Sequence, residues 1–462
     1  MTTKQIMFLL FLLFVSSLMA PPACQAADQQ ASQYPQQLLT FSATKEQQVR
    51  GIAADLKITV PSEISRFFAA ATHGDYTVIT NTMAQLAPQY AAMFKNSSGS
   101  LPAWSPFWQP MTEVESAYEA FATGGTKYPL AFGEDIVQSI PPGSIYFGGS
   151  DAGRMLVTAL CESQVQGKPF YTLTQNALTD SHYLDYVRAM YGKQVRLLTT
   201  NDMETALDEY KADALRRYEQ GKLRPNEDVQ VIDGEVHVGG PLAVMAINAR
   251  LVKVIMERNP KREFYMEESY PLDLLYPYLS PHGLILKLDH EPMATLTPQI
   301  LDADHAFWAN ECQSMVGGWL KQDTSISNVC AFAEAVFGRN DLLHFNGDKG
   351  FVTNDFATHA FSQLRVAIAG LYAWRLDNDS KADDTARLRT EADYAFRQAF
   401  ALCPTSPEVV FRYVNFLVLQ GRIDDAILLA GTAQKLAPDN EQFQRLLSQL
   451  QAIPAQTKET AH

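Results

Sequence analysis

Apolar and polar residues recur at two different spacings along this chain, and the changes of spacing mark its main divisions. From Lys45 to about Thr123, apolar residues return every three or four positions, which is typical of amphipathic helices. From about Phe132 to Lys321, short apolar runs bounded by turn residues alternate with helical stretches. After about residue 356 the spacing is helical again. The pattern predicts a central α/β domain with α-helical flanks.

The clearest α/β signal lies between Ile140 and Asp180. A β-type run, Ser144–Phe147, leads into the glycine-rich turn Gly148-Gly149-Ser150-Asp151. Helical spacing follows from Arg154 to Gln164, and a second β-type run covers Phe170–Thr174. A strand, a tight turn, a helix and a strand in this order predict a βαβ unit with parallel pairing.

Further β-type runs extend this unit into a sheet. They are Val195–Leu198, the hairpin Val229–Ile232 and Glu235–Val238 around Asp233-Gly234, Phe264–Glu267, and Leu284–Leu288. A helix at Thr297–Val316, with Thr297 as its N-cap, closes the series. We expect a mostly parallel, Rossmann-like sheet covered by helices.

An internal spacing of 34 residues marks the C-terminal region. Four residues of one segment return 34 positions later: Ala392, Phe396, Ala399 and Pro404 recur as Ala426, Ala430, Ala433 and Pro438. Small residues let two helices pack closely, and Gly421 suits the tight turn between them. This pattern resembles the tetratricopeptide (TPR) repeat, with one good unit at Pro407–Pro438 and a less regular unit before it. Because two repeats are fewer than a free-standing array needs, we expect them to lean on the α/β domain.

The first residues have the pattern of a secretory signal peptide. Lys4 supplies the positive charge, and the apolar run Ile6–Val15 is too short to span a bilayer, which needs about 20 residues. Cleavage before Ala27 would release the mature chain. The alternative is a lipoprotein anchored at Cys24, which the nearby prolines disfavour. We expect an exported protein, periplasmic or extracellular, without a membrane-spanning segment.

These observations divide the chain into five expected segments. They are a signal peptide at 1–26, an N-terminal helical domain at 27–130, the central α/β domain at 131–322, a connector at 323–355, and TPR-like helical repeats at 356–462.

Composition narrows the possible functions. The formal net charge of −14 argues against nucleic-acid binding, which needs a basic face. Four cysteines outside the leader lie among apolar neighbours and are expected to be small buried residues: Cys161, Cys312, Cys330 and Cys403. A bridge between Cys312 and Cys330 remains an alternative. No spacing typical of a metal site occurs, so we predict neither a metal nor a cofactor.

Known phosphate-binding motifs do not fit the glycine-rich turn. Arg154 and Met155 stand where a P-loop requires Lys and Ser or Thr, and Ser150 stands where a dinucleotide-binding loop requires glycine. Ligands of parallel sheets bind beyond the carboxyl ends of the strands. The candidate binding residues at those ends are Gly149, Ser150, Asp151, Arg154, Asn176 and Glu268.

Asp151 disfavours an anionic ligand, because its carboxylate already occupies the positive end of the following helix dipole. We therefore expect a small neutral polar ligand such as a sugar, with Asp151 and Asn176 as hydrogen-bonding partners. The alternative is that Asp151 and Arg154 form a structural helix cap. The sequence identifies no catalytic residue.

Several segments together resemble exported bacterial TPR-repeat proteins: PPGSIYFGGSDAGR, TLTQNALTD, YLDYVRAMYG, FYMEESYPLDLLYPYLSPHG and FRQAFALCPTSPEVVFRYVN. The α/β portion is also distantly similar to soluble regions of glycosyltransferase-like membrane proteins. The first resemblance implies a binding or scaffold protein whose helical repeats hold a protein partner. The alternative function is a cell-envelope transferase or hydrolase acting on a sugar or nucleotide-sugar at the strand ends.

Overall fold

The protein is mostly helical, with a few short strands of both parallel and antiparallel pairing. The computed structural model describes residues 34–95, 102, 104–148, 152–163, 170–192, 194–224, 227–268, 272, 274–378 and 382–459. The chain forms two units, one of residues 1–126 with 140–275 and one of residues 127–139 with 276–462. The domain limits expected from the sequence stay predictions.

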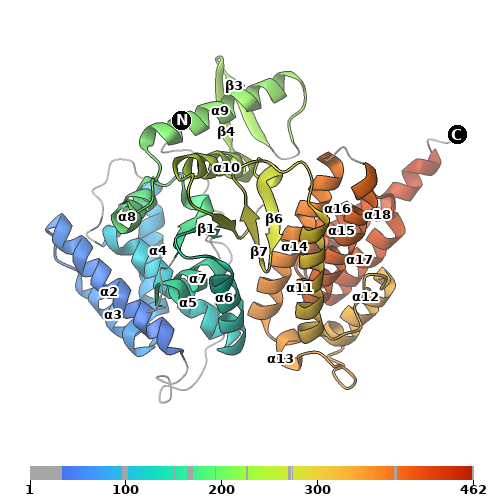
Figure 1. The fold of residues 1–462 in the computed structure, drawn as a ribbon, viewed down its shortest axis with the longest axis horizontal. Coiled ribbons are helices and arrows are strands. Elements are labelled where there is room, and N and C mark those ends of the chain that lie inside the picture. Colours follow the sequence, from blue (N-terminus) through green and yellow to red (C-terminus); the bar gives the residue numbers. More distant parts are fainter. Residues whose placement is uncertain are drawn as a thin grey trace. The chain divides into compact units, whose positions relative to one another are not determined.

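The first unit begins with helices and continues with alternating strands and helices (Figure 1, blue to green). Its first helical elements are α2 (Gln36–Leu56), α3 (Ser62–His73), α4 (Tyr76–Lys95), η3 (Ser105–Phe107) and α5 (Trp108–Gly124). There follow β1 (Ile145–Gly148), α7 (Ala152–Ser163), β2 (Tyr171–Thr174), η4 (Gln175–Ala177), α8 (Ser181–Tyr191), α9 (Thr200–Glu219), β3 (Asp228–Ile232), β4 (Glu235–Gly239), α10 (Gly240–Arg258) and β5 (Phe264–Met266).

The predicted βαβ unit is confirmed. β1 pairs in parallel with β2, with Ile145 opposite Tyr171, and it pairs in parallel with β5, with Ile145 opposite Phe264. All four residues of β1 are buried, as expected for a central strand covered on both faces. On one side, α7 packs against β2 and is itself covered by α2 and α5.

The hairpin around Asp233-Gly234 is also confirmed. β3 and β4 pair antiparallel, and φ is positive at both Asp233 (52°) and Gly234 (80°), as a type I′ turn requires. One end of this hairpin packs through the buried Val229 and Val238 against α9 and α10.

The predicted strand at Val195–Leu198 is absent. Val195 and Leu198 are buried, which explains their apolar character, but the backbone of this segment bonds to side chains rather than to a neighbouring strand. Asn259 accepts from the Arg196 amide and donates to the Arg196 carbonyl, while Arg188 donates to the carbonyl of Leu198. Sequence spacing cannot distinguish such a buried irregular segment from a strand.

The second unit combines a hairpin with a series of helices (Figure 1). Its elements are α6 (Lys127–Ser139), η5 (Tyr276–Tyr278), β6 (Leu279–His282), β7 (Ile285–Leu288), α11 (Pro298–Val316), α12 (Ile326–Ala333), the π turn η6 (Glu334–Gly338), α13 (Lys349–Val352), α14 (Asp355–Asn378), α15 (Ala382–Leu402), α16 (Pro407–Leu419), α17 (Ile423–Leu436) and α18 (Glu441–Glu459). Thr297 caps α11 by accepting from the Ile300 amide, as predicted.

The prediction of a mostly parallel sheet is correct only for β1, β2 and β5. The predicted strand Leu284–Leu288 exists as β7, but it pairs antiparallel with β6. β6 contains Pro281, and because proline is uncommon inside strands its sequence lacks a typical strand pattern.

The C-terminal helices form antiparallel pairs that follow the predicted 34-residue period. α14 packs on α15 and α16 packs on α17, with α18 against α17. All of the repeated alanines are fully buried: Ala392, Ala399, Ala426, Ala430 and Ala433. Gly421 has a φ of 72°, the left-handed conformation that the turn between α16 and α17 requires.

Candidate functional site

The predicted strand-end site lies only partly within the described residues. Gly149, Ser150 and Asp151 lie outside them, as does the side chain of Arg154, whose backbone belongs to the first turn of α7. Asn176 lies in η4 directly after β2. Glu268 follows β5 and is buried. Because β2 and β5 flank β1 in parallel, their carboxyl ends lie at one edge of the sheet, but the predicted ligand contacts stay predictions.

Buried polar groups are concentrated at this strand edge. Glu267 accepts a hydrogen bond of 2.6 Å from the hydroxyl of Tyr146. Gln175 is only 2% exposed, and neither atom of its amide has a hydrogen-bond partner among the described residues. The same is true of the side-chain oxygen of Asn248 on α10, a helix that packs against η4. Since an unpaired buried polar group costs about 1–3 kcal/mol, packing alone does not account for these amides.

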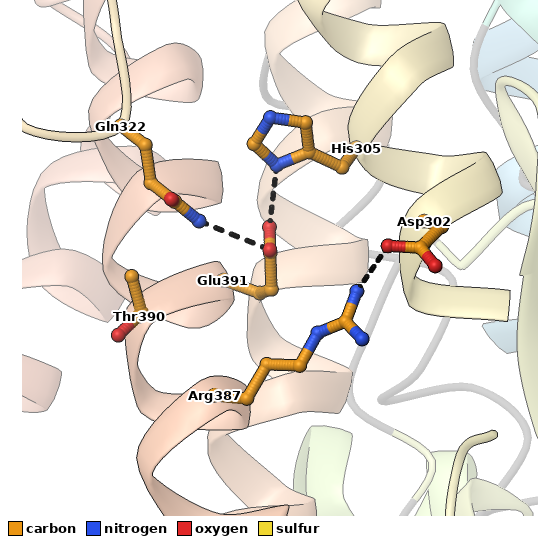
Figure 2. Close-up of a pocket in the computed structure, with 6 residues that line it drawn as sticks. All are labelled: Asp302, His305, Gln322, Arg387, Thr390 and Glu391. Atoms are coloured by element: carbon orange, nitrogen blue, oxygen red, sulfur yellow. Dashed lines mark hydrogen bonds and ion pairs between the residues drawn. The ribbon is translucent and has the colours of Figure 1, made fainter. Parts of the chain in front are cut away.

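A separate polar depression lies in the second unit, between α11 and α15. It has a volume of about 390 Å³ and is lined by Asp302, His305, Gln322, Arg387, Thr390 and Glu391. Figure 2 shows these side chains converging from α11, from the segment after it and from α15. None of these residues belongs to the site predicted from the sequence.

Two sets of contacts organise the depression. Glu391 accepts from His305 Nδ1 at 2.9 Å and from Gln322 Nε2 at 3.0 Å, so that both of its oxygens are engaged (Figure 2). Because a carboxylate can only accept, His305 carries a proton on Nδ1 in this contact. Asp302 and Arg387 form the second set, an ion pair with an Nη2–Oδ1 distance of 2.5 Å.

The two sets differ in their exposure to water. The side chains of Glu391 and His305 are 6% and 34% exposed, whereas those of Asp302 and Arg387 are 72% and 36% exposed, so the difference lies mainly between the two carboxylates. Ion pairs exposed to this degree contribute little to stability, about 0–1 kcal/mol. The Glu391 contacts therefore form the rigid part of the depression, and the Asp302–Arg387 pair can open at low cost.

α15 also holds the segment that supplies Gln322. The hydroxyl of Tyr394 donates to the carbonyl of Leu320, and Arg397 donates to the carbonyl of Gln322 at 2.8 Å. The ring of Tyr394 lies 5.1 Å from that of His305. These contacts place Gln322 and His305 on either side of Glu391.

A buried polar cluster lies on the inner side of α11. Asp304 accepts from Arg365 Nη1 at 2.8 Å and from the hydroxyl of Tyr372 at 2.7 Å, and Arg365 Nε donates to Gln398 at 2.8 Å. Arg365 also lies over the ring of Trp308. Burial opposes the charge of Arg365, but the neighbouring Asp304 carboxylate keeps the pKa of Arg365 above its ordinary value.

The buried cluster joins three helices, because its residues come from α11, α14 and α15. Burial, reinforced by the charge of Asp304, raises the pKa of Tyr372 well above its ordinary value, so its hydroxyl stays protonated and donates. We interpret this cluster as structural.

The polar depression is suited to binding rather than to nucleophilic chemistry. Among the residues that line the depression, Thr390 is the one with a hydroxyl group. This hydroxyl donates to the carbonyl of Ala386, one helical turn earlier. It is therefore not oriented by the His305–Glu391 pair, as an activated nucleophile would be. In the part of the chain that the structure describes, no group of three or more His, Cys, Asp or Glu side chains could hold a metal ion.

The paired C-terminal helices are covered by other elements of their own unit. α12 packs on both α15 and α17, while α6, η5 and β7 pack on α14. Arg375 of α14 fixes η5 by donating to the carbonyls of Tyr276, Pro277 and Met293. The first helix pair is thus covered on more than one side.

One face of α16 stays open. Phe411, Asn415 and Leu419 follow one another at intervals of four residues and are exposed, with 38% of Phe411 and 63% of Leu419 accessible. The ring of Phe411 lies 6.3 Å from that of Phe443 on α18. This line of residues, the open face of α16, is a strip on the second helix pair with two exposed apolar side chains and the polar Asn415 between them.

The cysteines in the described part of the chain have free thiols. Cys161, Cys312, Cys330 and Cys403 are all buried, and Cys312 and Cys330 are not bridged. Burial raises the pKa of Cys312 to about 12 and that of Cys330 to about 11, so that both thiols are protonated at neutral pH.

Comparison with known families supports the prediction of TPR-like repeats in the C-terminal region. Residues 389–450 match a family model described as tetratricopeptide repeat, which covers the end of the first helix pair, the second pair and the first half of α18. Comparisons with curated proteins and with solved structures gave no match. Among the described helices, none combines the length and the apolar character needed to cross a membrane. The chain contains a TPR region, and such repeats generally mediate protein interactions.

Proposed function

We propose that this protein is a binding protein that holds a partner protein on the open face of α16. The observation that carries this proposal is the apolar strip Phe411–Leu419, which lies within the region that matches the TPR model. Helical repeats bind partners through surfaces built from successive helices. Here α16 exposes two apolar side chains, Phe411 and Leu419, and the neighbouring helix α17 exposes one, Leu428.

Apolar side chains on this strip are suited to anchor a partner segment. Phe411 and Leu419 lie two helical turns apart, with the polar Asn415 between them. Interfaces commonly combine a few apolar anchors with polar groups that fix orientation. The proposed partner therefore presents two apolar side chains about two helical turns apart.

The test is affinity capture from an extract of the source organism, followed by calorimetry with the purified partner. Replacing both Phe411 and Leu419 with serine should abolish capture of the partner and weaken its binding at least about tenfold. The matched control is Leu343→Ser, because Leu343 is 80% exposed in the same unit but lies outside the repeats. Equal binding by the wild type and the double variant would contradict the proposal.

We further propose that the chain is exported, because of its leader-like first 26 residues. Mass spectrometry of the mature N-terminus tests this: a chain beginning at Ala27 supports cleavage by a signal peptidase. A lipid-modified Cys24 would indicate an anchored lipoprotein instead.

A second candidate function is the binding of a neutral polar ligand at the strand edge of the first unit. The specific observation is the unpaired amide of Gln175, with Asn248 on the adjoining helix. An amide donates and accepts, as a sugar hydroxyl does, so neutral sugars fit its requirements. An enzyme acting on a sugar or nucleotide-sugar would use this edge, but no described residue has a defined catalytic role there.

A screen of neutral sugars by thermal shift tests this second candidate. Gln175→Leu should remove any shift seen with the wild type, and without ligand it should leave stability unchanged or higher, because it removes a buried unpaired amide. A large loss of stability in Gln175→Leu would show that the amide has a structural partner, and the ligand interpretation would fail.

A further inference from the structure

We propose that the polar depression between α11 and α15 binds a small zwitterion, a free α-amino acid, between Asp302 and Arg387. This inference is independent of the proposed protein binding at α16, since the two sites share no residue. It rests on the cavity, on the arrangement of charges around it, and on the difference in exposure between its two sets of contacts.

Two charged groups in the lining are accessible to a ligand, one negative and one positive. Glu391 contributes a second negative charge to the lining, but both of its oxygens already accept from His305 and Gln322. The exposed groups are the carboxylate of Asp302 and the guanidinium of Arg387. A ligand bearing a single charge would pair with one of them and leave the other without its partner.

An α-amino acid offers each side chain of this ion pair a new partner of opposite charge. Its ammonium would bind the Asp302 carboxylate, and its carboxylate would bind the Arg387 guanidinium, whose fork matches the two oxygens. In the absence of ligand the two side chains pair with each other at 2.5 Å and are compensated. Because this pair is exposed, opening it costs little.

The remaining lining residues suit the rest of such a ligand. The cavity of about 390 Å³ lies within the size range of small-molecule pockets. His305 and Gln322 are held in place by Glu391, and behind them Tyr394 and Arg397 fix the supporting backbone. Figure 2 shows Glu391 with His305 and Gln322 beside the Asp302–Arg387 pair.

Isothermal titration calorimetry on the full-length mature chain tests the proposal. The probes are a panel of free amino acids with small, polar, charged and aromatic side chains, together with ethylamine and propionate, which each carry one charge. At least one amino acid should bind with a Kd in about the millimolar range or better. Ethylamine and propionate should each bind at least about tenfold more weakly, because each satisfies one of the two charges.

Variants locate the site. Asp302→Asn and Arg387→Gln should each weaken amino-acid binding at least about tenfold. Arg445→Gln is the control, since it removes an exposed arginine charge from the ion pair that Arg445 forms with Glu441 on α18, and it should bind as the wild type does. The proposal is overturned if no amino acid binds at concentrations up to about 10 mM, if a single-charge probe binds equally well, or if the Asp302 and Arg387 variants bind like the control.

Discussion

Two aspartate–arginine ion pairs lie on opposite sides of α11, and they differ in their exposure to water. Asp304 pairs with Arg365 in the core, where both side chains are almost completely buried. Asp302 pairs with Arg387 at the surface, where both are substantially exposed. The two aspartates are two positions apart on α11, so helix geometry points them toward nearly opposite faces of the helix.

The difference lies in what each pair can do. The buried pair is part of a cluster with Tyr372 and Gln398, and its charges have no access to water. Removing one member would leave the other charge uncompensated in the core. The exposed pair is solvated and can exchange its partner for a ligand. The two pairs have the same residue types, so the difference between a structural role for the buried pair and a binding role for the exposed pair follows from burial.

The largest effect should come from breaking the buried pair. Asp304→Ala should lower the free energy of unfolding by about 3–5 kcal/mol, because Arg365 would remain buried and charged without its partner. Urea denaturation measures this value. The double variant Asp304→Leu/Arg365→Met should lose less than Asp304→Ala alone, since no uncompensated charge remains. A loss below 1 kcal/mol, at the scale of a surface pair, would show that the buried cluster does not hold the fold.

A smaller effect should follow from enlarging the apolar contacts of the second helix pair. Ala426→Leu and Ala433→Leu should each cost about 1–3 kcal/mol, because both alanines are fully buried and the added atoms overpack the contact. Thermal denaturation tests this. Melting temperatures equal to that of the wild type in both variants would contradict the close packing that the 34-residue period predicts.

Glu115 of α5 is a carboxyl group that lies in a largely buried place near a second carboxyl group, that of Glu119. Burial, with the charge of Glu119, raises the pKa of Glu115 to about 7 from its ordinary 4.5. Between these values the folded state binds a proton that the unfolded state does not bind, so stability falls as pH rises from 4.5 to about 7. Melting temperatures across this range should decline less steeply in Glu115→Gln. An unchanged slope would mean that Glu115 is ionised normally in the folded protein.

The smallest effect should come from the exposed pair. Asp302→Asn should change the free energy of unfolding by at most about 1 kcal/mol, because solvent already screens the interaction with Arg387. Urea denaturation beside Asp304→Ala gives the direct comparison of the two aspartates. A loss as large as that of Asp304→Ala would remove the distinction between a structural and an exchangeable pair.

Local patterns predicted local structure well. The Asp233-Gly234 turn and the Thr297 cap depend on residues a few positions apart, and both are present. The 34-residue period predicted the helix pairs because small residues at Ala426 and Ala433 reflect a close helix contact. The parallel pairing of β1 with β2 was likewise indicated by the local order of strand, tight turn, helix and strand.

Features that depend on distant residues could not be predicted. Asp302 and Arg387 are 85 positions apart, and His305 and Glu391 are 86 apart, so no spacing in the sequence connects them. Charged residues usually lie at the surface, so no local pattern indicates that Arg365 and Asp304 are buried. At the strand edge, Gln175 follows β2 as Asn176 does but was not among the predicted ligand contacts, because a lone glutamine gives no sign that its amide will be buried without a partner.

The most direct test of the proposed function is hydrogen–deuterium exchange of the full chain with and without its captured partner. The account predicts that binding slows exchange in α16 (Pro407–Leu419) and at the start of α18 near Phe443, and leaves exchange in α9 and α10 unchanged. Protection confined to residues outside 389–450, with none in α16, would contradict it.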